Sequence, residues 1–154
     1  MTQNSKNEKK EKAVIVTQSE MENAFRSHNG FWAAYKGNPN HTHKMVLFYA
    51  VECGLKAYYM REKKFELSSA ATDNEMSASA FSHRLNDLLT NLKITGNIPG
   101  ITKNVDKPIV AQHLHAAWRY GKKLDEQEET LCIQSLTKIL SDIKMKLALP
   151  GGIF

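Results

Sequence analysis

The sequence contains few of the residues that mark disulfide-rich, metal-binding or membrane-spanning proteins. Its two cysteines, Cys53 and Cys132, form no C-x-x-C pair, and each lies in an apolar helical pattern typical of buried, reduced thiols. The longest apolar run, Met45 to Val51, is far shorter than the roughly 20 residues of a membrane-spanning helix. The polar, lysine-rich start does not resemble a signal peptide. We therefore expect no metal, no cofactor, no membrane contact, and a cytoplasmic location.

Positive charge is only slightly in excess over negative charge. The formal net charge is +5, of which the first 12 residues, with four lysines and two glutamates, contribute +2. A domain at +3 allows RNA or an acidic partner to bind but does not indicate either, and a solvated surface is the simpler interpretation. We expect residues 1–12 to be a disordered basic tail, residues 13–149 a single helical-bundle domain, and residues 150–154 a C-terminal tail.

Two regular elements are predicted in the first third of the domain. The apolar residues 13–16 indicate a short strand or a hydrophobic staple. Ser19 and Glu22 form a capping-box pattern, so we expect a helix from Ser19 to about Tyr35, ending at the turn formed by residues 37–40. Its inner face is predicted to hold Met21, Phe25, Phe31, Trp32 and Tyr35.

The clearest predicted element is a helix over about residues 41–64, which begins after the N-cap residue Asn40. It is apolar on almost every side, so it must be covered by neighbouring helices or by a second subunit. Glu52 and Lys56 are the polar exceptions, and their i, i+4 spacing lets them pair. We interpret them as a buried ion pair that fixes helix register or a dimer, with a functional role as the alternative.

Three further helices are expected in the rest of the domain. One covers about residues 79–92; one starts at Asp106 or Lys107, with Pro108 in its first turn, and ends near Gly121; and one runs from the cap Asp125 to about Leu149. The last helix carries an apolar stripe formed by Leu131, Cys132, Leu136, Ile139, Leu140, Ile143 and Leu147. These elements predict an all-α fold, an antiparallel bundle of four to five helices.

Three segments in this order resemble the HEPN superfamily, the "higher eukaryote and prokaryote nucleotide-binding" helical domains. They are FYAVECGLKAYYM at 48–60, FSHRLNDLL at 81–89 and AAWRYG at 116–121, so that the resemblance covers about residues 20–148. It implies a bundle that dimerises and a setting in RNA metabolism, toxin–antitoxin pairs or antiviral defence. It also implies metal-independent RNA cleavage wherever an R-x-x-x-x-H motif is present.

The sequence departs from the family at that motif. Arg119 is followed by YGKKLDE, with no histidine in range, and His28 lies only two residues after Arg26. We therefore expect a protein that is not an enzyme but a non-catalytic RNA-, nucleotide- or partner-binding module. A divergent ribonuclease and a purely structural dimerisation domain are the alternatives.

If the chain does cleave RNA, the candidate catalytic residues are His113, His115 and Arg119. His115 and Arg119 share a helix face at i, i+4, whereas His113 lies about 160° away from His115 around a regular helix. An imidazole moves protons near neutral pH and a guanidinium stabilises phosphate charge, so this pair suits phosphodiester cleavage within a dimer. A surface phosphate contact or a helix-packing role is the alternative for the same pair.

Other residues are candidates for ligand contact. Arg119, Tyr120, Trp118 and Lys122 could bind and stack on single-stranded RNA, although packing in the core is the more natural role for Trp118. His83 matches a histidine of the family, and we interpret it as a capping or hydrogen-bonded core histidine that Asp87, one turn later, could hold. His41 and His43 lie at a helix start with no acidic or thiol ligand nearby in sequence, so we interpret them as solvated rather than metal-binding.

Overall fold

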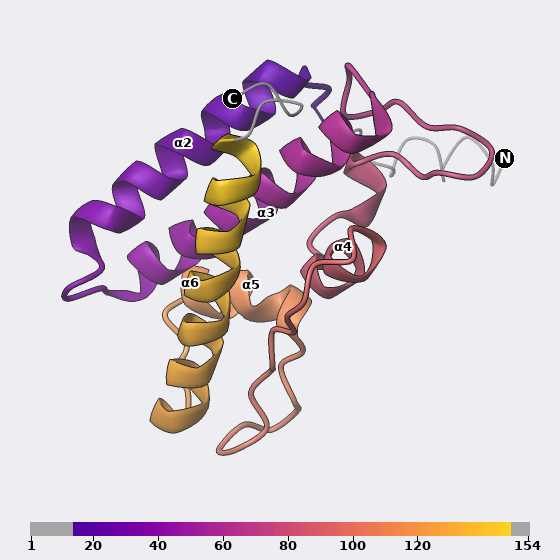
Figure 1. Ribbon diagram of the computed structural model, residues 1–154. Coiled ribbons are helices and arrows are strands. Elements are labelled where there is room, and N and C mark those ends of the chain that lie inside the picture. The colour runs from indigo at the N-terminus through magenta and orange to yellow at the C-terminus, as the bar shows by residue number, and fades with distance from the viewer. Residues whose placement is uncertain (1–13, 149–154) are drawn as a thin grey trace, which may run out of the picture.

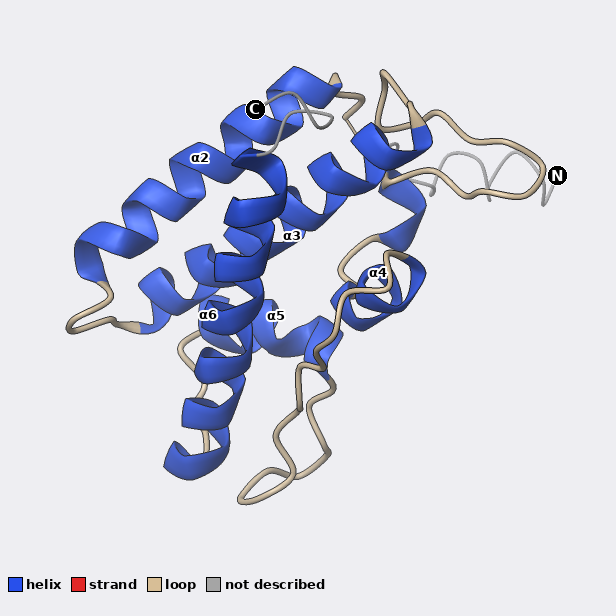
Figure 2. Ribbon diagram, viewed as in Figure 1, coloured by secondary structure: helices blue, strands red, loops and turns tan. Residues whose placement is uncertain are grey.

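The computed structural model describes residues 14–148, and that part of the chain is an all-α bundle with no regular strand (Figures 1 and 2). This confirms the predicted fold class. The five α-helices are α2 (Gln18–Tyr35), α3 (His41–Lys63), α4 (Leu85–Asn91), α5 (Leu114–Arg119) and α6 (Glu126–Ala148), joined by the 3₁₀ turns η1 (Ser79–Phe81) and η2 (Ala111–His113). The tails predicted at 1–12 and 150–154 lie outside the described residues. None of the described helices combines the length and the apolar character needed to span a membrane.

Helix α3 is the centre of the bundle, as its composition predicted. Helix α2 packs along it, and α4, α5 and α6 contact it from other sides (Figure 1). The Asn40 side chain caps its start by accepting from the backbone N–H of His43 at 2.9 Å, and His43 Nδ1 accepts from the Asn40 N–H at 3.0 Å. Because helices of the same chain bury Phe48, Leu55 and the other core residues of α3, its apolar character does not by itself require a second subunit.

The start of α2 differs from the prediction by two residues. Thr17, not Ser19, is the N-cap, and Glu20 completes the capping box. The shift is explained by an antiparallel bridge between Thr17 and Leu67, which fixes where the extended chain turns into helix. Of the predicted inner face, Met21, Phe25 and Trp32 are buried, but Phe31 and Tyr35 are exposed.

Two predicted helices are shorter than expected. The chain over 79–92 breaks at Ser82, which has φ +52°, so that η1 and α4 replace one continuous helix. The chain over 106–110 is not helical, because Ile109 exchanges both backbone hydrogen bonds with Ile101 and the residue before Pro108 is restricted to extended conformations. Helical turns therefore begin only at Ala111.

The cap of α6 and most of its apolar stripe agree with the prediction. Asp125 caps α6 by accepting from the Glu128 N–H at 3.0 Å. The Glu128 carboxylate does not close the box but accepts the N–H groups of Thr102 and Lys103, which holds that loop against α6. Leu131 is exposed, contrary to the predicted stripe, whereas the rest of the stripe faces the core.

Candidate functional site

A group of polar side chains lies between the apolar helices. It draws on α2, on α3, on the turn between η1 and α4, and on α5. We call it the histidine cluster, and its members are His28, Tyr49, Glu52, Lys56, His83, His115 and Arg119. Four elements therefore converge on one point, although His28 and Arg119 are far apart in sequence.

Glu52 is the anion at the centre of the histidine cluster. Its Oε2 accepts from Lys56 Nζ at 2.8 Å and its Oε1 lies 2.9 Å from His83 Nδ1. The side chains of Glu52 and Lys56 are only 13% and 9% exposed, so the predicted pair is a buried ion pair. Burial opposes ionisation of Glu52, but the hydrogen bonds and charges of His83 and Lys56 outweigh it and lower its pKa.

This ionised carboxylate fixes the proton on His83. A carboxylate only accepts hydrogen bonds, so His83 Nδ1 must carry the proton that it donates to Glu52. In the neutral ring, the other nitrogen, Nε2, is then a free acceptor. The His83 side chain is 41% exposed, so the cluster reaches the surface at this ring.

His115 is the buried partner of His83. The centroids of the two rings are 3.9 Å apart, and Phe48 lies on His115 with a centroid distance of 5.0 Å. Burial, together with the neighbouring His83, lowers the pKa of His115 to about 4. His115 is therefore a neutral imidazole at pH 7.

Arg119 and Tyr49 complete the site. Arg119 Nη2 donates to Tyr49 Oη, whose own hydrogen can then be donated to His115 Nδ1, 3.3 Å away. In that arrangement, His115 Nε2 carries its proton and is a donor. The guanidinium of Arg119 lies at the surface, and the hydrogen bond with Tyr49 raises its pKa.

Arg119 differs from the other three arginines of the chain in its contacts. Arg26 and Arg84 lie beside the carboxylates of Glu22 and Asp87, and Arg61 donates to backbone carbonyls of α6. No ion pair of the described residues involves Arg119. The N–H groups of Arg119 that are not bonded to Tyr49 are suited to bind an anion.

The structure places the predicted site residues in different surroundings. His115, Arg119, Glu52 and Lys56 come together, whereas His113 is exposed on η2. Trp118 is buried and donates from Nε1 to Glu129 at 2.8 Å, which supports its packing role and leaves it unable to stack on RNA.

Tyr120 and Lys122 are exposed beyond Arg119 and remain free to contact a ligand. His83 is held by Glu52, not by Asp87, which is exposed beside Arg84.

Tyr49 and His28 belong to the histidine cluster but were not predicted as site residues from the sequence. Tyr49, Glu52 and Lys56 stand at i, i+3 and i+7 of α3, which places all three on one helix face. A polar stripe on an otherwise apolar helix was therefore the available signal for Tyr49. Nothing in the sequence pairs His28 with that stripe.

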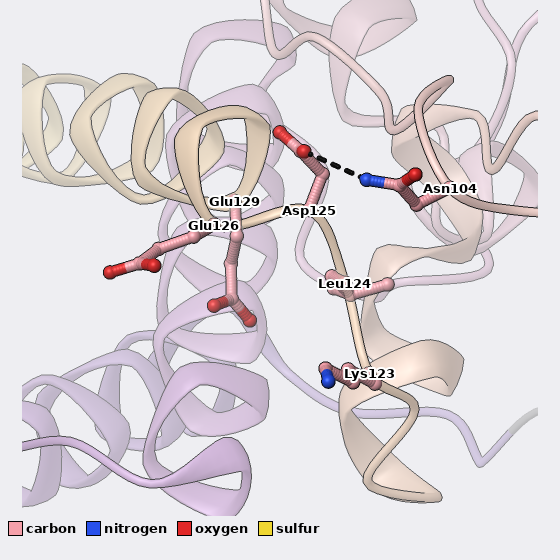
Figure 3. A pocket seen from close by; sticks show the side chains of 6 residues that line it. All are labelled: Asn104, Lys123, Leu124, Asp125, Glu126 and Glu129. Atoms are coloured by element: carbon pink, nitrogen blue, oxygen red, sulfur yellow. Dashed lines mark hydrogen bonds between the residues drawn. The ribbon is translucent and has the colours of Figure 1, made fainter.

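Three hollows of the described surface have no lining residue in the histidine cluster. The largest one described, about 750 Å³, is formed at the start of α6 by Asn104, Lys123, Leu124, Asp125, Glu126 and Glu129, and Figure 3 shows Asn104 bonded to Asp125 inside it. Three carboxylates line it, and none of its lining residues belongs to the histidine cluster. Its charge makes it a poor site for phosphate.

His41 and His43, the two histidines at the start of α3, do not belong to the histidine cluster. The His43 ring accepts from the backbone N–H of the N-cap residue Asn40 and stacks on Tyr35, while the His41 ring lies next to Gly121. Within residues 14–148, no three histidine, cysteine or carboxylate side chains are grouped as metal ligands.

Comparison with known proteins returns no relative. No family model matches the chain, and no match is found among curated proteins or among solved structures.

Proposed function

We propose that the chain binds a phosphate-bearing ligand, RNA or a nucleotide, at the histidine cluster, with Arg119 as the phosphate contact. The observation that carries the proposal is the state of Arg119. It is exposed, held by Tyr49, and joined to no carboxylate of the described residues. An arginine in this state offers several N–H donors in a fixed plane to a phosphate.

The surroundings of Arg119 support a polar, phosphate-bearing ligand. Tyr120 and Lys122 are exposed beside it, and no acidic residue occurs between Lys107 and Leu124. The Nε2–H of His115 and the Nε2 of His83 are further polar groups of the same cluster. The guanidinium of Arg119 is exposed rather than enclosed, which suits a flexible polymer lying across the surface better than an enclosed small molecule.

The test is equilibrium binding of labelled single-stranded RNA in EDTA, with the Arg119→Ala variant. Arg26→Ala is the matched control, because Arg26 is also an exposed arginine but sits on α2 beside Glu22. We expect Arg119→Ala to weaken binding and to lower the salt dependence by about one counterion, while Arg26→Ala binds like the wild type. Equal affinities of all three proteins would overturn the proposal.

A second candidate function is metal-independent RNA cleavage, and one specific observation favours it. The Glu52 carboxylate orients the partly exposed His83 so that, in the neutral ring, Nε2 is the acceptor, and the His115 ring lies 3.9 Å from it between centroids. In this reaction His83 Nε2 takes the proton of the ribose 2′-hydroxyl as its oxygen attacks phosphorus. The 5′-oxygen leaves with a proton from solvent, and Arg119 stabilises the phosphate charge.

Cleavage is tested separately from binding. The wild type and His83→Ala are incubated with the same RNA in EDTA, and products are searched for 2′,3′-cyclic phosphate ends. Cleavage that His83→Ala abolishes, with RNA affinity retained, supports an enzyme. Binding with no cleavage by the wild type leaves the binding module as the function.

The biological setting rests on the resemblance alone. We propose that this binding activity serves a defence or toxin–antitoxin type system, with a homodimer or a cognate protein partner as the working assembly. The observation that supports a dedicated ligand site, whatever the system, is that seven polar side chains converge in an otherwise apolar bundle.

A further inference from the structure

Two exposed aromatic side chains stand at the end of α2, next to the histidine cluster. Phe31 is 39% exposed and Tyr35 is 48% exposed, and their ring centroids are 5.1 Å apart. The ring of His43, at the start of α3, stacks on Tyr35 with a centroid distance of 4.3 Å and an interplanar angle of 7°. These three residues, which we call the aromatic platform, are held in place without being buried.

The aromatic platform is continuous with the proposed phosphate site. His28, Phe31 and Tyr35 stand at i, i+3 and i+7 of α2 and therefore share a face. The His28 ring lies 6.1 Å from the Tyr49 ring, and Tyr49 holds Arg119. At about 1.5 Å per residue, Tyr35 lies about 10 Å from His28 along the helix, the length of about three stacked bases.

The charge of this region fits a polyanion. Residues 23–51 contain no aspartate or glutamate and include Lys36 and Lys44. Lys36 is exposed immediately after Tyr35, whereas Lys44 is paired with Glu129. A nucleic acid strand uses both the cation beside Tyr35 and the aromatic faces, whereas a hydrophobic protein partner would use only the aromatic faces.

From this arrangement we infer that the aromatic platform stacks the bases of single-stranded RNA whose phosphate is bound at Arg119. This inference rests on the proposed function and narrows its ligand to unpaired RNA. A base on Tyr35 lies on the ring face opposite His43. Paired bases cannot reach the ring, because their faces are already stacked within the duplex.

The experiment compares Tyr35→Leu, Tyr35→Phe and Arg119→Ala for binding to three probes. The probes are single-stranded oligoadenylate, the same strand in a duplex, and an abasic ribose-phosphate strand. Leu131→Ala, which removes an exposed apolar side chain from α6, is the control. Circular dichroism checks that each variant keeps its helices.

We expect wild type to bind oligoadenylate more tightly than the duplex or the abasic strand. Tyr35→Leu weakens oligoadenylate binding by about 5-fold to 150-fold and leaves the abasic strand unaffected, because one stacked base is lost. Tyr35→Phe and Leu131→Ala bind as the wild type does.

The two proposals fail in distinguishable ways. Unchanged oligoadenylate affinity in Tyr35→Leu, with loss in Arg119→Ala, overturns the stacking inference and leaves the phosphate site. No RNA binding by the wild type overturns both. A change of Tyr35→Leu from dimer to monomer, with RNA affinity unchanged, would also overturn the stacking inference, because the face would then be a contact between two copies.

Discussion

The replacement Glu52→Gln removes the central anion of the histidine cluster and should lower the free energy of unfolding more than the loss of an exposed ion pair. Glu52 and Lys56 are buried and 2.8 Å apart, and Glu52 is also the partner of His83. Removing one member of a buried ion pair leaves the other charge uncompensated, which costs about 3–5 kcal/mol. A domain of this kind is stable by about 5–15 kcal/mol, so the loss is a large fraction of the total.

The assay is urea denaturation followed by helical circular dichroism, with the slope m compared among variants. Asp142→Asn is the matched control, because it breaks an i, i+4 pair with Lys138 on the exposed side of α6. We expect that change to cost less than about 1 kcal/mol. A Glu52→Gln loss as small as that of the control would refute the buried-pair argument.

The double variant Glu52→Gln/Lys56→Met separates stability from orientation of His83. Removing both charges should recover about 1–3 kcal/mol of the free energy of unfolding, because the stranded ammonium is gone. His83 still lacks its carboxylate, so the RNA affinity or cleavage that depends on it should not return. Recovery of both properties together would contradict the role assigned to Glu52 in orienting His83.

Three further outcomes are expected. His115 has a pKa of about 4 in the folded protein and about 6.5 in the unfolded chain, so its contribution to the free energy of unfolding is fully present above pH 6.5 and falls as the pH drops towards 4. After a discount for solvent screening, we expect urea titrations at different pH values to show a loss of about 1–2 kcal/mol. His115→Gln should remove this pH dependence, whereas His113→Gln, at an exposed site, should not. Gly54→Ala should destabilise by about 1–3 kcal/mol in thermal melts, because the added methyl meets Ile143 and Phe25 within 3 Å, and an increase in melting temperature would refute this packing. Glu128→Ala should speed amide hydrogen exchange at Thr102 and Lys103, and unchanged exchange would refute the anchoring of that loop.

Periodicity and capping predicted the long helices well. The bounds of α3 and the caps Asn40 and Asp125 follow from local sequence, because capping uses neighbouring residues only. The break at Ser82 and the extended stretch before Ala111 could not be predicted in this way. They depend on contacts with distant segments, such as the pairing of Ile109 with Ile101.

The histidine cluster was predictable only in part. The Glu52–Lys56 pair and the His115–Arg119 face are helical spacings that the sequence displays directly. The link between them is not local, because His83 is 31 residues from Glu52 and Tyr49 is 66 residues from His115. Only the three-dimensional packing of α3, α5 and the turn before α4 reveals that these residues form one site.

The distinction between local spacing and three-dimensional packing also explains why Phe31 was wrongly predicted to lie on an inner face. Trp118 and Phe31 are both large aromatics at helical positions, yet one is buried and the other is 39% exposed. Trp118 is fully buried and donates its N–H to Glu129 of α6, whereas Phe31 lies near the end of α2, where its ring neighbours are Tyr35 and His43. Residue type alone does not distinguish a buried core aromatic from an exposed aromatic of the platform.

The most direct measurement of the central claim is an NMR titration of the six imidazole side chains with a single-stranded RNA in EDTA. We predict that the signals of His83 and His115 shift together on binding, that the signal of exposed His113 is less affected, and that Arg119→Ala suppresses these shifts. RNA-induced shifts confined to His113, or the same shifts in Arg119→Ala as in the wild type, would contradict the placement of the ligand at the histidine cluster.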